Sequence, residues 1–207
     1  MRTLEEFSRE IDKAVVGILE LRSDEGHYAI IGYDLPLSVT RQEGQVLFAV
    51  ARAFGPRKVL ELGTGTGYST AWLAAAVPDA EITTIDDFNE GGTGDMGLEA
   101  TMAILDRTKA VNVSIHRTDF FAAQNDYMEW SPHMIFADGI LSRSILNIVD
   151  MGPGTIMALH DITDRAFIKD PCAVFVTASK LGFHGTVEDV ERARRAASLF
   201  VHEDSFG

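Results

Sequence analysis

Three glycines at alternate positions mark the segment of this sequence best suited to hold a small ligand. Gly63, Gly65 and Gly67 follow a short apolar run and precede a helix-forming segment. Glycine adopts the backbone conformations of a tight turn, and its missing side chain lets a ligand approach the main chain. The amides at the start of the following helix can bind a carboxylate or a phosphate. Glu61, Thr64 and Ser69 are polar residues in or beside this loop.

The spacing of these glycines separates two kinds of cofactor. A dinucleotide loop has the pattern G-x-G-x-x-G, whereas Tyr68 stands here where its last glycine would be, and no G-x-x-x-x-G-K-[ST] phosphate loop is present. Asp86 ends the next apolar run, about 20 residues beyond the loop, where a carboxylate accepts hydrogen bonds from ribose hydroxyls. The pattern favours a ribose-containing cofactor other than NAD. An ordinary turn for the glycines and a helix N-cap for Asp86 are the simpler interpretations.

Three further polar side chains follow apolar runs. Asp138 follows residues 134–137, and the pair His160–Asp161 follows residues 155–159. The carboxyl ends of parallel strands meet at one edge of a sheet, so these side chains are expected in the crevice that holds the cofactor. They could share a metal ion, or His160 could act as a general base, because nearby carboxylates raise the pKa of an imidazole. A hydrogen-bonded histidine and solvated or helix-capping carboxylates are the alternatives.

Alternating strands and helices are needed to bring these residues together. Apolar runs predict strands at residues 58–62, 81–85, 111–116, 133–137 and 155–159, and helical spacing predicts helices at residues 4–21, 41–54, 68–77 and 97–110. The tail predicts two antiparallel strands, 183–190 and 198–202, joined by the polar residues 191–197. The expected fold is α/β and Rossmann-like, with a seven-stranded, mostly parallel sheet, an antiparallel edge hairpin, helices on both faces and extra N-terminal helices.

The composition excludes several partners. The 207 residues carry 18 Lys and Arg against 31 Asp and Glu, a formal net charge of -13, which repels a nucleic-acid backbone. No apolar run approaches the ~20 residues of a membrane span. The single cysteine, Cys172, cannot form an intrachain disulfide, and we assign it no role. We expect a cytoplasmic protein with a small-molecule substrate and no nucleic-acid or membrane partner.

The length fits a single domain over residues 1–207. Residues 1–55 are expected to form an N-terminal helical segment that serves as a lid and dimer region, and residues 56–207 the cofactor-binding core. The amphipathic N-terminal helix and the apolar stretch from Gly26 to Pro36 are the predicted contacts of a twofold homodimer.

Two segments carry a family resemblance. The stretches from Leu37 to Leu47 and from Val59 to Ser69 resemble the catechol and caffeoyl-CoA type of small-molecule O-methyltransferase, in the class I methyltransferases that depend on S-adenosylmethionine. The similarity runs from about Leu37 to Asp161. It implies S-adenosylmethionine as cofactor, with Ser38, Val39 and Thr40 at its methionine end and Ser69 on its carboxylate. It also implies that Glu61 and Gly63 line the pocket, that Asp86 holds the ribose, and that Asp119 and Phe120 contact the adenine; helix capping is the alternative for Asp119.

The acceptor side departs from that family. There, an Asp and an Asp-Asn pair hold a magnesium ion that lowers the pKa of a substrate hydroxyl, whereas this chain has Asp138 and the pair His160–Asp161. An imidazole suits iron or zinc better than magnesium, so magnesium, manganese, iron and zinc all stay open. Leu141 stands where the family has a lysine, or a related group a histidine. Activation by the metal alone, His160 as base, or an acceptor that needs no deprotonation therefore remain alternatives.

The resemblance predicts methyl transfer to oxygen on a small molecule. Transfer to nitrogen, a cofactor-binding enzyme that does not methylate, and a module that senses the cofactor are the alternatives. An NAD-dependent oxidoreductase is more distant, because the glycine spacing disfavours it.

Overall fold

A central sheet organises the chain. The computed structural model describes residues 4–22, 26–32, 38–89, 93–138, 154–161, 173–176 and 181–200. Among these, seven strands pair in the order β5-β4-β3-β6-β7-β9-β8, and all neighbours are parallel except those of β9. The strands are β3 (Lys58–Leu62), β4 (Glu81–Asp86), β5 (Val113–Arg117), β6 (Met134–Ala137), β7 (Ile156–Leu159), β8 (Ala173–Val176) and β9 (Leu181–His184). The mostly parallel sheet with an antiparallel edge is as predicted.

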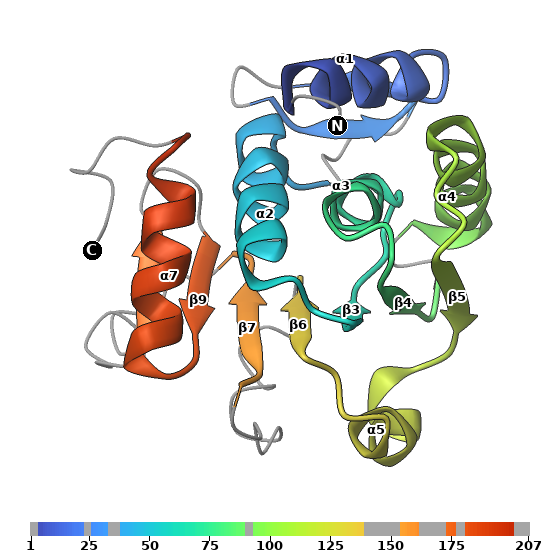
Figure 1. Ribbon diagram of the computed structural model, residues 1–207. Helices are drawn as coiled ribbons and strands as arrows, with labels where there is room; N and C mark the ends of the chain where they lie inside the picture. The colour runs from blue at the N-terminus through green and yellow to red at the C-terminus, as the bar shows by residue number, and fades with distance from the viewer. Residues whose placement is uncertain are drawn as a thin grey trace.

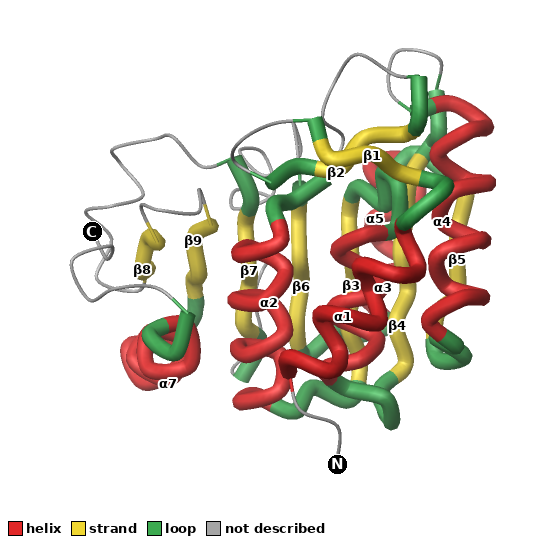
Figure 2. The backbone as a smooth tube through the Cα atoms, turned by 90° about the horizontal axis from the view of Figure 1, so that it is seen from above, coloured by secondary structure: helices red, strands yellow, loops and turns green. Residues whose placement is uncertain are grey.

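Helices cover both faces of this sheet. They are α1 (Leu4–Val15), α2 (Arg41–Phe54), α3 (Tyr68–Ala76), α4 (Gly94–Thr108), α5 (Phe120–Glu129) and α7 (Val187–Ala197). In Figure 1, α5 lies on the opposite side of the strands from α2 and α3, and α1 lies as an outer layer across α2, α3 and α4. A separate pair of short strands, β1 (Leu19–Leu21) and β2 (Tyr28–Ile30), crosses one end of the sheet in Figure 2. None of the helices in the described part of the chain has the length and apolarity to cross a membrane.

Side chains alternate between the two faces of the strands and so build two cores. One set packs toward α2 and α3: Val59, Met134, Phe136, Ile156 and Ala158. The other packs toward α5: Leu60, Leu62, Ile135, Ala137, Met157 and Leu159. Because successive side chains of a strand point to opposite faces, the face of each residue that follows a strand is also set.

The predictions for both ends of the chain need correction. The first helix ends at Val15 rather than at Leu21, because Gly17 takes a left-handed conformation (φ 84°) and the chain turns into β1. Near the C-terminus, residues 187–197 form α7 instead of a strand and a polar connection. Val190, Ala193 and Ala197 recur at helical spacing and are buried, which the mixed charged pattern concealed. The antiparallel edge hairpin exists, but β8 and β9 form it; residues 201 and 202, Cys172 and Leu141 lie outside the described residues.

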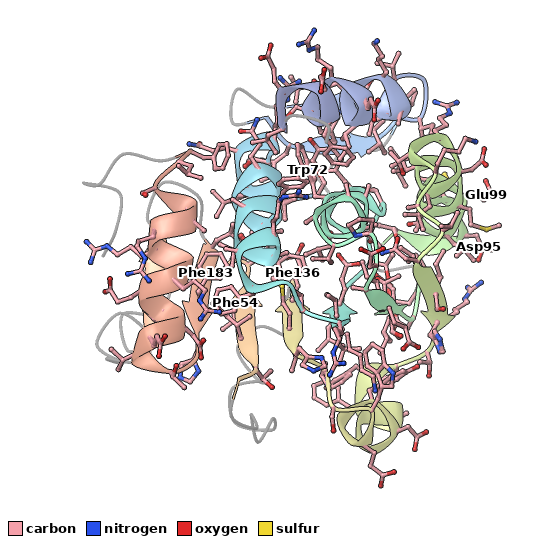
Figure 3. The ribbon with its side chains drawn as sticks, in the orientation of Figure 1. Phe54, Trp72, Asp95, Glu99, Phe136 and Phe183 are labelled. Atoms are coloured by element: carbon pink, nitrogen blue, oxygen red, sulfur yellow. The ribbon has the colours of Figure 1, made fainter. Side chains whose placement is uncertain are left out.

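One close helix contact fixes the distance between α2 and α3. Trp72 is fully buried and lies between α2 and α3 in Figure 3, and Gly44 is the residue of α2 beside it. A Cβ atom at Gly44 would lie 2.3 Å from the indole Nε1. The edge of this indole also packs against Phe7 of α1, with ring centroids 5.3 Å apart. The lack of a side chain at position 44 thus lets three helices pack together.

We expect Gly44→Ala to lower the free energy of unfolding by about 1–3 kcal/mol, measured by urea denaturation. In a helix with free space around this position, the same change would raise the free energy of unfolding by up to about 1 kcal/mol. A decrease therefore indicates that the indole is close to position 44. Adding Trp72→Phe should recover part of the loss, because the smaller ring makes room. A stability equal to or above that of the wild type would contradict this packing.

Candidate active site

The strand register brings the predicted polar residues into one row. Leu62, Ala137 and Leu159 lie opposite one another on β3, β6 and β7. The amide of Asp138 donates to the carbonyl of Leu62 (2.9 Å), and the amide of His160 donates to the carbonyl of Ala137 (2.9 Å), so the pairing continues one residue further. By the alternation of faces, Asp138 and His160 both point toward α2. Their predicted convergence with the glycine loop is confirmed.

The glycine loop is as tight as its sequence predicts. Gly63, Gly65 and Gly67 have φ values of 92°, 55° and 77°. A Cβ atom at Gly63 would lie 3.2 Å from the carbonyl oxygen of Asp138, and one at Gly67 would lie 2.8 Å from Cα of Thr101. Backbone conformation therefore favours glycine at all three positions, and at Gly67 the closeness of the neighbouring chain excludes a larger residue as well.

Asp86 ties the end of β4 to this loop. Its Oδ2 accepts from the amide of Gly65 (2.9 Å), and its Oδ1 accepts from the amide of Phe88 (2.8 Å). The side chain therefore does not cap a helix. Each carboxylate oxygen can accept a second hydrogen bond, so the group stays able to bind hydroxyl donors.

Glu61 lies beneath the loop and is fully buried. The hydroxyls of Ser69 and Thr70 donate to its two oxygens at 2.6 and 2.5 Å. Burial raises the pKa of Glu61 to about 7, and these hydrogen bonds hold it below what burial alone would give. The hydroxyls of Thr64 and Thr84 form another bond under the loop at 2.6 Å. In this structure the Ser69 hydroxyl therefore bonds to Glu61.

Two predicted adenine contacts follow β5. The Oδ1 atom of Asp119 accepts from the amide of Ala122 (2.9 Å), so this carboxylate caps the start of α5. Phe120 is buried in the core on the α5 side of the sheet. Contact with an adenine stays a prediction for both residues.

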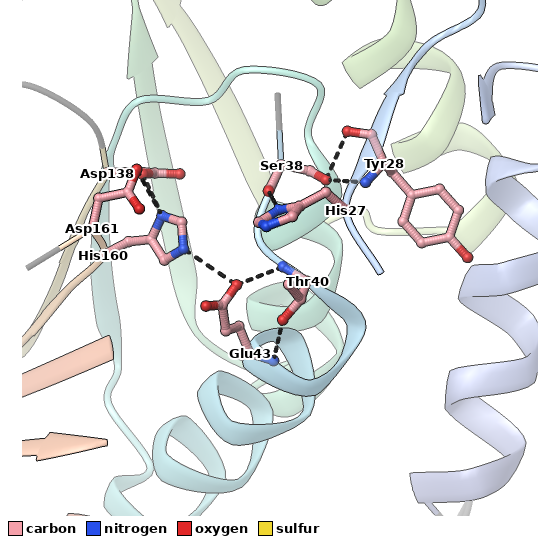
Figure 4. A network of polar contacts seen from close by, with 8 residues as sticks. All are labelled: His27, Tyr28, Ser38, Thr40, Glu43, Asp138, His160 and Asp161. Carbon is pink, nitrogen blue, oxygen red and sulfur yellow. Dashed lines mark hydrogen bonds and ion pairs between the residues drawn. The ribbon is translucent and has the colours of Figure 1, made fainter. Parts of the chain in front are cut away.

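The segment before α2 joins the β1–β2 strands to the sheet. Ser38 accepts from the amide of Tyr28 (2.7 Å) and donates to its carbonyl (2.8 Å), while Val39 is buried. Thr40 is the N-cap of α2 and forms a reciprocal capping box with Glu43. These contacts, drawn in Figure 4, place residues 38–40 beside the row of strand ends.

His160 lies between two carboxylates. Its Nδ1 is 2.7 Å from Oδ1 of Asp138, and its Nε2 is 3.2 Å from Oε2 of Glu43, an ion-pair contact without the angle of a hydrogen bond (Figure 4). Burial by itself lowers the pKa of His160, but the hydrogen bond to Asp138 and the nearby carboxylates of Asp138 and Glu43 outweigh it and raise the pKa to about 10. The ring is therefore a cation at neutral pH.

Glu43 also belongs to the site, although its contact with His160 was not predicted from the sequence. Thr40-x-x-Glu43 before an apolar run is the sequence signature of a capping box, which would have placed Glu43 in the first turn of α2. That signature says nothing of a contact with His160, about 120 residues further along the chain.

The predicted metal ligands meet in the structure. Among the residues that the structure describes, Asp138, His160 and Asp161 form a group whose ligand atoms lie within 4.8 Å of one another. A metal needs a ring nitrogen with a free lone pair. Both nitrogens of His160 face carboxylates, so an ion held by the ring would have to displace one of these two contacts. Asp161 is exposed and stands 3.9 Å from the ring.

Comparison with known proteins identifies the fold. No protein-family model matches the chain. Sixty residues are 40% identical to malonyl-(acyl-carrier protein) O-methyltransferase of Methylococcus capsulatus, a match that covers 28% of this chain and 22% of that enzyme's length. A solved methyltransferase from Geobacter sulfurreducens has a TM-score of 0.60 and 14% identity over 89% of this chain and 92% of its own. The O-methyltransferase TomG from Streptomyces achromogenes, solved with S-adenosylmethionine, has a TM-score of 0.52 and 20% identity over 96% and 86%. The chain has the fold of these methyltransferases.

The raised pKa of Glu61 makes a pH-dependent contribution to stability. Its pKa rises from 4.5 to about 7 on folding, so the contribution is fully present below pH ~4.5 and is lost as the pH rises through about 7. Between these values we expect the free energy of unfolding of the wild type to fall by about 3 kcal/mol relative to Glu61→Gln, measured by urea denaturation. Glu81→Gln, at the exposed start of β4, is the control and should follow the wild type. Parallel pH profiles for the wild type and Glu61→Gln would refute this role of burial.

Proposed function

We propose that the chain transfers a methyl group from S-adenosylmethionine to oxygen on a small-molecule acceptor. The observation that carries this proposal is the row Gly63, Asp138 and His160, in which a ligand-binding loop and a polar pair share one edge of the sheet. In a doubly wound sheet this edge is where ligands bind. The fold shared with solved methyltransferases supports it.

Several features around the loop fit this cofactor. Gly67, the N-cap of α3, offers no side-chain hydrogen bond to the helix, so the first turn suits the methionine carboxylate. The buried Thr66 hydroxyl, within the loop, has no partner among the described residues. Asp86 supplies acceptors for the ribose. The further residues proposed to line the cofactor are Ser38, Val39, Thr40, Glu61, Thr64, Gly65, Ser69, Asp119, Phe120 and Asp138.

We assign to Asp138 the role of receiving the acceptor's proton. S-adenosylmethionine would supply a methyl group bound to a positively charged sulfur. That sulfur is a good leaving group because it becomes a neutral thioether. The acceptor oxygen would form its bond to the methyl carbon as the carbon–sulfur bond breaks, and the electron pair of that bond would stay on sulfur. The acceptor's proton would pass to Asp138 and then to water. His160, whose nitrogens both face carboxylates, holds Asp138 instead of taking the proton itself. The remaining catalysis rests on alignment in a dry site.

Cofactor binding tests the proposal directly. We expect S-adenosylmethionine and S-adenosylhomocysteine to bind in isothermal titration calorimetry, and Asp86→Asn to weaken both by roughly 10- to 100-fold, because charge-assisted hydrogen bonds are lost. Asp87→Asn is the matched control, since the Asp87 carboxylate bonds only to Asn89 in the described contacts. Absence of binding to the wild type would refute the proposed function. Equal affinities of the Asp86→Asn and Asp87→Asn variants would show that Asp86 does not contact the cofactor.

We further propose a homodimer and, from the single cysteine and the acidic charge, a cytoplasmic location. The apolar side of α1, predicted as a dimer contact, packs on its own chain through Phe7 and Ile11. Exposed apolar side chains gather instead around β1 and β2. They are Val16, Leu21 and Ile31, with exposed fractions of 70%, 58% and 53%.

Sedimentation velocity should show a dimer for the wild type, and the double change Leu21→Glu and Ile31→Glu should convert it to a monomer, because buried charges would face each other across the contact. Val111→Glu introduces the same charge at an apolar residue that is 94% exposed, between α4 and β5, and should leave the dimer intact. A monomeric wild type, or a monomer produced by Val111→Glu as well, would contradict this interface.

A further inference from the structure

We propose that Glu43 is a positioning residue of the active site: it holds the ring of His160, and His160 in turn holds Asp138 with one oxygen directed to the acceptor. The inference deepens the proposed function and rests on it for the role of Asp138. The contacts themselves are independent of any cofactor.

The first step concerns why position 43 carries a carboxylate. Glu43 Oε2 accepts from the amide of Thr40 at 2.6 Å and also lies 3.2 Å from Nε2 of His160. The capping bond needs only an oxygen, which a glutamine amide would also provide. A carboxylate that is 2% exposed needs a paired cation, and His160 is the cation that the structure gives it. Glu43 therefore does more than cap α2.

The second step concerns direction. The exposed fractions of the side chains rise from 2% at Glu43 and 4% at His160 to 24% at Asp138. His160 contacts Oδ1 of Asp138, which leaves Oδ2 for another donor. The chain of contacts thus begins in the protein interior and ends at Asp138, whose backbone carbonyl and Cβ lie beside Gly63 of the glycine loop.

The third step concerns the acceptor. Asp138 contacts His160 through Oδ1, and the exposed Asp161 stands 3.9 Å from the same ring nitrogen. Carboxylate oxygens accept hydrogen bonds, so this end of the triad selects an acceptor hydroxyl that donates to Asp138 and loses its proton there.

Ring nitrogen spectra of the full chain test the arrangement without any cofactor. In protein labelled with 15N-histidine, with signals assigned through His160→Gln, we expect both ring nitrogens of His160 to carry protons protected from solvent exchange. Glu43→Gln keeps the capping oxygen but loses the charge, and should speed exchange of the Nε2 proton roughly tenfold or more. Asp138→Asn should act on the Nδ1 proton instead.

Asp189→Asn is the matched control, because Asp189 occupies the same place in the capping box of α7, away from the site. It should leave the His160 signals unchanged. A bare ring nitrogen in the wild type, or spectra of Glu43→Gln identical to those of the wild type, would overturn the proposal; the wild-type measurement decides even if a variant does not fold. Loss of a ring proton on adding magnesium or zinc would also overturn it, in favour of metal coordination.

Titration of the same proteins with S-adenosylmethionine separates this inference from the proposed function. If the cofactor does not bind the wild type while the ring signals are as expected, the proposed function fails and the positioning contacts stand. If the cofactor binds but the ring signals are absent, Glu43 has no positioning role and the cofactor assignment stands.

Discussion

The site depends on the register of three parallel strands. β3, β6 and β7 are hydrogen-bonded side by side and end at the same level, so the residue after each strand emerges at one edge. Period-two alternation then decides which of those side chains face α2. A slip of one residue in any pair would turn Asp138 or His160 toward α5 and separate it from Glu43. Apolar packing on both faces of the sheet thus sets the arrangement of Glu43, His160 and Asp138.

The parts of the site that sequence could predict are those set by local pattern. Short apolar runs predict the strands, and each is followed by a part of the site: the glycine loop, Asp86, or the pair His160–Asp161. Parallel pairing of these strands implies that the residues after them share one edge of the sheet. The contact between Glu43 and His160 could not be predicted in this way, because it depends on how closely α2 packs on the sheet. That distance is set by tertiary contacts such as the one between Gly44 and Trp72.

The same reasoning explains the error near the C-terminus. Residues 183–190 contain apolar side chains that suit a strand as well as the first turn of a helix. Thr186 and Asp189 form a capping box that marks the true start of α7, the same signature that Thr40 and Glu43 carry in α2. In both places the sequence contains the capping box, and this box predicts the start of the helix better than the spacing of apolar residues does. Burial, which decides between strand and helix here, becomes visible only in the fold.

Neighbouring residues of α2 face different partners, and this has a consequence for how the site can vary. Glu43 reaches His160, while Gly44, one step of about 100° further around the helix, lies against Trp72. Any side chain larger than hydrogen at position 44 would push α2 outward and lengthen the reach required of Glu43. An added methyl group between α2 and α3 would therefore move the Glu43 carboxylate away from His160 at the strand ends. Core packing and the contact between Glu43 and His160 cannot diverge independently in this protein, and changes at position 44 should be tolerated only with compensating changes at Trp72.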